Sequence, residues 1–207
     1  MDDFDEARDL VKVRLYPDEH VAAGHPMVAR PLAESVVEAL VLDRPTHVMT
    51  LAGDQPEKWG LTPDELFEIG FANVRREVPP AIQRIDAEPS AATIFAAVGD
   101  SFFTTTWVRW LDELTEIPAE GALVGLPHRH TILIHPIRDL SVLSAVQHVI
   151  TGTRLLYERG PGSLSRHVYW WRRGSLRWLP SSLEEDRIEL RPPEDFTAML
   201  ERLSGPA

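Results

Sequence analysis

Cysteine is absent from the 207 residues, and its absence removes several kinds of chemistry. Without a thiol, the chain forms no disulfide and supplies no thiolate nucleophile, zinc thiolate or iron–sulfur ligand. Lysine is scarce as well, with two residues, Lys12 and Lys58. Long hydrophobic runs are also lacking, since no stretch approaches the roughly 18 apolar residues that a transmembrane helix needs. We therefore expect a protein of a reducing compartment with no membrane partner.

Positive charge is the next shortage, because 32 acidic residues outnumber 21 basic ones and give a formal charge of −11. Binding to a phosphate backbone depends on Lys and Arg that release counterions, so nucleic acid is not an expected partner. The excess of acid either keeps the protein soluble or attracts a basic protein partner. The acidic start MDDFDEARDL lacks the basic and then apolar order of a signal peptide, so we expect a cytoplasmic location.

The remaining composition, 43% hydrophobic and 26% charged, is typical of a globular protein with a sizeable core. Residues 1–30 show little periodicity apart from a short alternation at 11–15, and we expect a partly mobile N-terminal segment there. Residues 31–207 are expected to form a single α/β domain, because this length suits one hydrophobic core.

Three pairs of strands are predicted, each pair separated by a turn signal. The pairs are residues 36–42 with 47–51, 122–126 with 131–134, and 167–171 with 176–179. A further buried strand is predicted at 92–98, and helices are predicted at 62–76, 103–114, 140–158 and from about Pro193. The fold class is therefore α+β or mixed α/β: a largely antiparallel or mixed sheet of hairpins with about four helices packed on it.

The helix over 62–76 carries the strongest local signal. Thr62 suits the N-cap, Pro63 suits the first helical position, and Glu65 is placed to bond back to the cap nitrogen. The helix over 140–158 has a more general pattern, with apolar residues near one face. The residues that it should bury are Leu143, Val146, Ile150 and Leu155.

The tip of the second hairpin, residues 127–130, is unusually cationic. His128 and His130 are two residues apart, so in an extended segment both would point to the same side, as two ligands of a metal would. No H-E-x-x-H or comparable spacing supplies further ligands, and we expect no metal and no cofactor. With Arg129 between them, the two histidines are candidate binding residues.

A nucleophilic serine has little support, because the G-x-S-x-G motif is absent. Ser101, after Gly99 and Asp100, is the nearest approximation to a nucleophile on a turn. Such a sequence more often begins a helix, with Asp100 or Ser101 as the cap. Asp86 and Glu88 could resemble a glycosidase carboxylate pair, but that chemistry depends on a separation that a sequence does not give.

An aromatic and basic stretch lies in the third hairpin. Its residues are Tyr169, Trp170, Trp171, Arg172, Arg173, Arg177 and Trp178. Trp, Tyr and Arg are enriched at interfaces, so the stretch could form a stacking surface for a ligand or protein, with Trp171 and Arg173 as candidate binding residues. Alternation along a two-sided strand explains it equally well, with one tryptophan in the core and its neighbour partly exposed.

The order of several short motifs resembles the uncharacterised bacterial family called DUF1444 or YtpQ-like. The motifs are the turn Trp59-Gly60, the capped helix LTPDELFEIGFANVRRE and the strand pair ALVGLPHRHTILIHPI, within residues 34–138. The family's Ala-x-x-Asn-Leu-like helix ending is approximated here by residues 70–74, which include Asn73, and its hairpin tip by 127–129. The resemblance implies a cytosolic α/β domain of unknown activity, assigns no catalytic residue, and leaves the tryptophan-rich C-terminal third without a counterpart.

The leading hypothesis is a non-catalytic binding or protein-interaction module, because no catalytic constellation is present. Its candidate binding residues are Asn73, His128, Arg129, His130, Trp171 and Arg173. One alternative is a hydrolase-type enzyme with a site near the 99–101 and 127–130 loops. Another is an immunity-type protein that neutralises a basic toxin.

Overall fold

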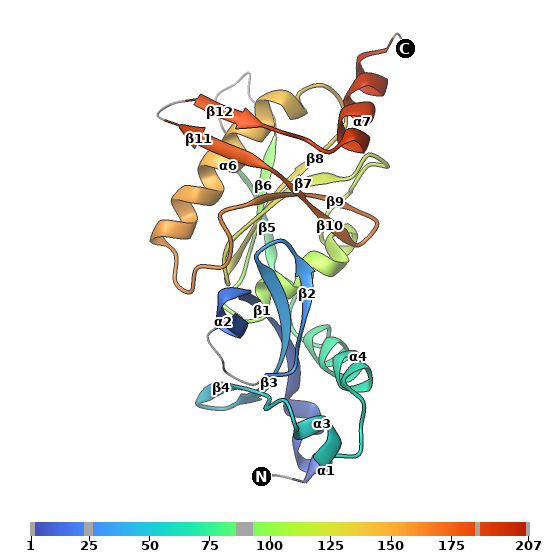
Figure 1. The fold of residues 1–207 in the computed structure, drawn as a ribbon, viewed down its shortest axis with the longest axis vertical. Coiled ribbons are helices and arrows are strands. Elements are labelled where there is room, and N and C mark those ends of the chain that lie inside the picture. The colour runs from blue at the N-terminus through green and yellow to red at the C-terminus, as the bar shows by residue number, and fades with distance from the viewer. Residues whose placement is uncertain (1–2, 23–26, 86–92, 185–186, 206–207) are drawn as a thin grey trace. The chain divides into compact units, whose positions relative to one another are not determined.

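The computed structural model describes residues 3–22, 27–85, 93–184 and 187–205 (Figure 1). The chain divides into two compact units, unit 1 over Met1–Pro79 and unit 2 over Pro80–Ala207. This division differs from the single domain expected for residues 31–207, because each unit has its own sheet. The predicted α+β class is confirmed, and every strand pairing in the described ranges is antiparallel.

Unit 1 is a four-stranded sheet with helices. Its elements are α1 (Phe4–Ala7), η1 (Arg8–Leu10), β1 (Val11–Pro17), α2 (Glu19–Ala22), β2 (Ala29–Ala33), β3 (Val36–Arg44), β4 (His47–Thr50), α3 (Gln55–Lys58) and α4 (Pro63–Val74). The predicted pairing of β3 with β4 is confirmed. β3 is the central strand and pairs with β1 along the whole of β1, so part of the N-terminal segment belongs to the core of this unit.

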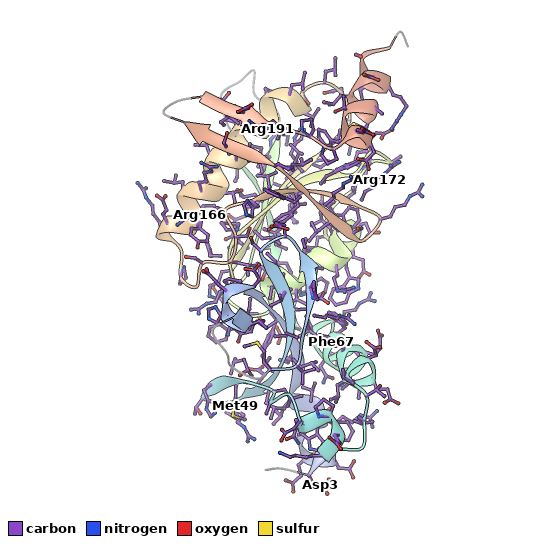
Figure 2. All side chains as sticks on the ribbon, in the orientation of Figure 1. Asp3, Met49, Phe67, Arg166, Arg172 and Arg191 are labelled. Atoms are coloured by element: carbon purple, nitrogen blue, oxygen red, sulfur yellow. The ribbon has the colours of Figure 1, made fainter. Side chains whose placement is uncertain are left out.

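Helix α4 begins at the predicted capping box. The Thr62 hydroxyl accepts a hydrogen bond from the Glu65 amide (3.3 Å), and the Glu65 carboxylate accepts one from the Thr62 amide (2.8 Å). The buried face of α4 approaches β1 closely, since a Cβ on Gly70 would lie 3.0 Å from the Val13 side chain. Phe67, labelled in Figure 2, projects from the same helix and carries the Arg30 guanidinium 4.0 Å from its ring centroid.

Unit 2 contains a six-stranded sheet in the order β10-β9-β7-β8-β6-β5 and a small sheet of β11 and β12. Its elements are β5 (Ala81–Ile85), β6 (Ile94–Val98), η2 (Thr104–Trp110), α5 (Leu111–Leu114), β7 (Ala122–His128), β8 (Thr131–Pro136), α6 (Val142–Arg159), β9 (Val168–Arg172), β10 (Ser175–Leu179), β11 (Ser181–Glu184), β12 (Arg187–Leu190) and α7 (Glu194–Ser204). The second and third predicted hairpins are confirmed as β7–β8 and β9–β10.

The six-stranded sheet is covered on both faces, which explains why every residue of β7 and β8 is buried. One face packs against α6 and α7 in a cluster that includes Leu123, Val168 and Phe196. On β9, Trp170 joins this cluster, whereas its neighbour Trp171 donates from its indole to a carbonyl of η2. Successive strand residues point to opposite faces, so the two tryptophans pack on opposite faces of the sheet.

Two helix predictions need correction. Helix α6 does not bury Leu143 and Leu155, which are 58% and 44% exposed, because its buried stripe runs through Val142, Val146 and Val149 instead. The expected helix over 103–114 is a 3₁₀ helix, η2, followed by the single α-helical turn α5. Three buried β-branched threonines lie within η2 and favour this departure from a regular α-helix.

Candidate functional site

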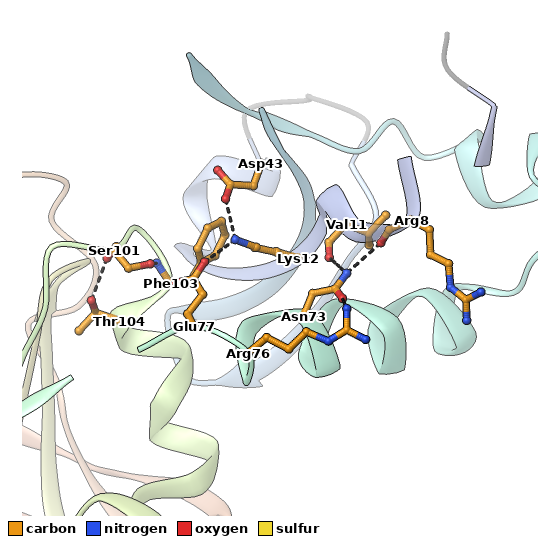
Figure 3. Close-up of polar contacts among 10 residues, drawn as sticks. All are labelled: Arg8, Val11, Lys12, Asp43, Asn73, Arg76, Glu77, Ser101, Phe103 and Thr104. Carbon is orange, nitrogen blue, oxygen red and sulfur yellow. Dashed lines mark hydrogen bonds and ion pairs between the residues drawn. The ribbon is translucent and has the colours of Figure 1, made fainter. Parts of the chain in front are cut away.

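Asn73 belongs to the scaffold of unit 1 (Figure 3). Its side-chain amide nitrogen donates to the carbonyl oxygens of Arg8 (2.8 Å) and Val11 (2.7 Å), and its oxygen accepts from Arg76 (3.0 Å). The side chain is buried, so these bonds satisfy polar groups that water does not reach. Asn73 therefore links α4 to the start of β1. Arg129, which lies in the other motif of the family resemblance, belongs to unit 2.

The prediction that aromatic side chains around Trp171 form an exposed stacking surface is wrong. Trp171 is 3% exposed, and its indole nitrogen donates to the Val108 carbonyl oxygen at 2.7 Å. Trp170 and Tyr169 are buried as well, because helices cover both faces of the sheet. Arg173 is exposed, but its φ of 49° places it in the β9–β10 turn, where it forms the turn together with Gly174.

The structure brings together the two loops that the hydrolase hypothesis uses. The Gly99 amide donates to the His130 carbonyl oxygen (3.2 Å), and Nδ1 of His130 donates to the Gly99 carbonyl oxygen (3.0 Å). Nε2 of His130 accepts from Nε of Arg129 at 2.9 Å, so each ring nitrogen of His130 has a partner inside the protein. The Arg129 guanidinium lies 4.6 Å from the ring centroid of Phe102. The contacts join residues 99–102 to residues 127–130 in one cluster.

His128 and Ser101 are also used by the local fold. Nδ1 of His128 accepts from the His130 amide (3.3 Å), and burial, followed by the charges of His130 and Arg129, lowers the pKa of His128. The ring lies directly on Gly160, where a Cβ would fall 2.1 Å from the ring. The Ser101 hydroxyl accepts from the Phe103 amide (3.1 Å), and Ser101 precedes η2 as expected for a helix start (Figure 3).

The cluster at 99–102 and 127–130 therefore has the geometry of a structural contact. Among the described residues, no group of three or more His, Asp or Glu side chains is placed to hold a metal ion. The weaker carboxylate candidates, Asp86 and Glu88, lie outside the described residues.

A pocket of about 420 Å³ in unit 2 was not predicted. It lies where β8 ends, and its walls come from β5, β6, the segment after α5 and the loop before α6. Arg84 contributes from β5, Thr93 and Phe95 from β6 and its start, and His135 and Pro136 from β8. Glu116, Arg138 and Asp139 complete the charged part of the lining.

His135 is the most unusual member of this lining, because it is 3% exposed and only one of its ring nitrogens has a partner. Nδ1 donates to the Thr93 carbonyl oxygen at 2.8 Å, so the proton resides on Nδ1 and Nε2 carries a lone pair. Nε2 is buried and has no hydrogen-bond partner among the described residues. Burial lowers the pKa of His135 against smaller opposing effects of the Thr93 carbonyl and Asp139, so the ring favours its neutral form.

The charged groups of the pocket are already partly paired. Asp139 accepts from the Ser141 amide at 2.7 Å, and hydrogen bonds from the Ser141 hydroxyl and amide hold the pKa of Asp139 below its usual value. Arg138 pairs with Glu116 at 3.1 Å, and both side chains are mostly exposed, so this pair contributes little to stability. These groups give the rim a mixture of positive and negative charge around a neutral imidazole.

Sequence reasoning missed His135 because nothing local distinguishes it from an ordinary core histidine. The available signal was a histidine at the end of an otherwise apolar strand, four residues before Asp139. What distinguishes His135 is the hydrogen bond of its Nδ1 to Thr93, which lies 42 residues earlier. The pairing of β6 with β8 brings the two residues together.

Comparisons with family models, curated proteins and solved structures found no match to this chain. The resemblance to DUF1444 over residues 34–138 therefore stays a prediction. Within the described ranges, no helix combines the length and the apolar character that crossing a membrane requires.

Proposed function

We propose that this protein is a non-catalytic binding module that holds a small molecule in the pocket around His135. The observation that carries the proposal is the pocket of about 420 Å³ in unit 2, whose lining combines His135 with charged and apolar side chains.

Binding is favoured over catalysis by what surrounds the imidazole. A histidine that activates a serine or threonine nucleophile is hydrogen-bonded to the hydroxyl, whereas Nε2 of His135 has no such partner in the described part of the chain. The pocket volume falls within the range of roughly 300–1,000 Å³ that is usual for small-molecule sites. The protein-interaction form of the hypothesis stays a prediction, with Arg173 as its exposed residue.

The test is to fill the pocket. Thr115 lines it and is partly exposed, so Thr115→Trp would occupy the pocket volume with little disturbance of the core. Thr151→Trp, at an exposed position of α6, is the matched control. A mixture of small polar fragments would be screened by saturation-transfer NMR. We expect fragments that bind the wild-type protein and Thr151→Trp but lose about tenfold or more in affinity for Thr115→Trp. Binding that is equal in all three proteins, or no binding at all, would refute the proposal.

A further inference from the structure

We propose that an arginine strip in unit 2 binds an acidic segment of a partner protein. The strip consists of two arginines, each in contact with an aromatic ring, and of the glycine-rich loop between them: Arg129 with Phe102, Arg166 with Tyr157, and residues 160–163. None of these residues lines the His135 pocket, so the inference goes beyond the proposed function and does not depend on it.

Contacts along the loop make the strip continuous. The guanidinium of Arg166, which is labelled in Figure 2, lies 4.6 Å from the ring centroid of Tyr157. The Ser163 hydroxyl donates to the Tyr157 carbonyl oxygen at 2.7 Å. One residue earlier, the Gly162 carbonyl oxygen accepts from the Arg129 amide at 3.1 Å, and a Cβ on Gly162 would lie 3.1 Å from the Arg129 side chain. The two arginines therefore border the same loop.

Neither arginine of the strip has a carboxylate partner in the part of the chain that the structure describes. This is unexpected in a protein with 32 acidic and 21 basic residues, where other exposed arginines form ion pairs, as Arg138 does with Glu116. The segments 99–102, 127–130 and 154–166 contain four arginines, Arg129, Arg154, Arg159 and Arg166, and two carboxylates, Asp100 and Glu158. The strip thus belongs to segments with an excess of positive charge in a chain whose formal charge is −11.

The ring contacts restrain each guanidinium and leave most of its hydrogen-bond donors unused. A cation–π contact attracts the charge but supplies no oxygen acceptor for the five N–H donors. Within the described ranges, Arg129 uses only Nε, which donates to Nε2 of His130 at 2.9 Å. Arg166 is exposed, and Arg129 is partly exposed. Each terminal pair of nitrogens is therefore a positioned fork of the kind that binds both oxygens of a carboxylate.

An acidic protein segment fits this arrangement better than a nucleic acid does. A phosphate also matches the guanidinium fork, but a nucleic acid carries a charge at every nucleotide and would meet repulsion from a chain of charge −11. A short acidic segment needs contact only with the strip. Phe102 is 39% exposed and adds apolar surface, so we expect the segment to combine carboxylates with an apolar side chain.

The experiment measures the fluorescence anisotropy of labelled peptides mixed with the wild-type protein. The peptides carry a pair of Glu residues at varied spacing beside a Leu, and the matched peptides carry Gln in place of Glu. We expect the Glu peptides to bind at least about tenfold more tightly than the Gln peptides, with an affinity that falls as salt is added. Failure of every Glu peptide to bind at low salt, or equal binding of the two sets, would overturn the inference.

Arg166→Gln is the decisive variant, because Arg166 is exposed and its loss should not disturb the core. It should weaken binding of the Glu peptides about tenfold, the equivalent of one charge-assisted hydrogen-bonded pair. Arg166→Lys keeps the charge but lacks the fork, so it should recover only part of this loss. Arg129→Gln should weaken binding similarly, and Arg166→Gln decides the question if Arg129→Gln does not fold.

Arg191→Gln is the matched control. It removes the same charge from an exposed arginine in another part of unit 2 and should change the affinity less than twofold (Figure 2). Equal losses in Arg166→Gln and Arg191→Gln would show a general attraction of charge and would refute the assignment to the strip.

Other occupants of the strip are tested with the same variants. Oligothymidylate or phosphatidylserine vesicles that bind more tightly than every Glu peptide, and lose this binding in Arg166→Gln, would overturn the acidic protein segment as the ligand. Sedimentation velocity tests a second copy of the chain. Self-association that disappears in Arg166→Gln would identify this chain itself as the occupant and would likewise overturn the inference.

Discussion

In His135, one ring nitrogen has a hydrogen-bond partner and the other has none among the described residues. Its Nδ1 is held by a carbonyl on the neighbouring strand, and this bond fixes which nitrogen is left without a partner. The neutral form is maintained by burial, which lowers the pKa of the ring. Protonation of the ring would oppose its burial, so acid should destabilise the fold at this residue.

The first prediction concerns pH and the stability of the protein. An unfolded histidine has a pKa of about 6.5, and the folded value of His135 lies below it, so the unfolded state binds more protons in this window. The free energy of unfolding should fall as the pH drops from about 6.5 toward the lowered pKa, and His128 should add to the same slope. Urea denaturation at several pH values measures this slope, which should be shallower in His135→Gln.

His148→Gln is the control for this measurement, because His148 lies on the exposed face of α6. An equal change of slope in both variants would show that the loss of any histidine, and not burial, sets the acid dependence.

The second prediction separates a structural from a binding role for Asn73. Asn73→Ala should lower the free energy of unfolding by about 1–3 kcal/mol, because the Arg8 and Val11 carbonyls lose their donor. Asn73→Asp should cost more, since a carboxylate would face two carbonyl oxygens. Glu68→Ala, at an exposed position of the same helix, is the control for chemical denaturation. A fully stable Asn73→Ala protein would contradict the scaffold role.

At the scale of elements, the close approach of β7 to α6 depends on Gly125. A Cβ at this position would lie 2.1 Å from the Thr153 hydroxyl oxygen, which is buried and has no partner in the described residues. The contact joins the centre of the six-stranded sheet to the helix that covers it. The glycine is thus required by packing and not by its backbone conformation.

The third prediction is a double-mutant cycle on this contact. Gly125→Ala should destabilise the protein by about 1–3 kcal/mol through overpacking. Thr153→Ala alone removes an unsatisfied hydroxyl and should cost less, and the double variant should recover part of the Gly125→Ala loss. Gly152→Ala, whose Cβ would meet only the flexible end of Leu133 at 3.3 Å, should have a small effect. Strict additivity in thermal or urea unfolding would exclude the proposed clash.

The elements that could be predicted from sequence are those specified by neighbouring residues. The capping box of Thr62 and Glu65 marked the start of α4, and the Arg173-Gly174 turn, with φ of 49° and 77°, marked the third hairpin. The edge strand β5 was missed because its mostly exposed residues give no alternating pattern. The pocket was missed because the pairing of β6 with β8 creates it, and no local pattern encodes that pairing.

At the scale of the whole molecule, the division into two units suggests that each has its own cooperative stability. Unit 1 is built around β3, and unit 2 around the cluster beneath α6 and α7. Separate cores allow separate transitions, which departs from two-state unfolding.

The fourth prediction follows from this division. In scanning calorimetry, Asn73→Ala should lower the midpoint of one transition and Gly125→Ala that of the other, because the residues belong to different units. A single transition that both variants shift equally would show that the two units unfold as one.

The order of strands in the larger sheet also has a consequence during synthesis. Strands β6, β7 and β8 are complete once residue 136 has been made, but β7 also pairs with β9, which begins at Val168 after the whole of α6. A nascent chain therefore presents one open edge of a strand whose residues are all buried in the finished protein. Such an edge is a template for pairing with another chain, so the nascent protein is exposed to aggregation while α6 and β9 are translated.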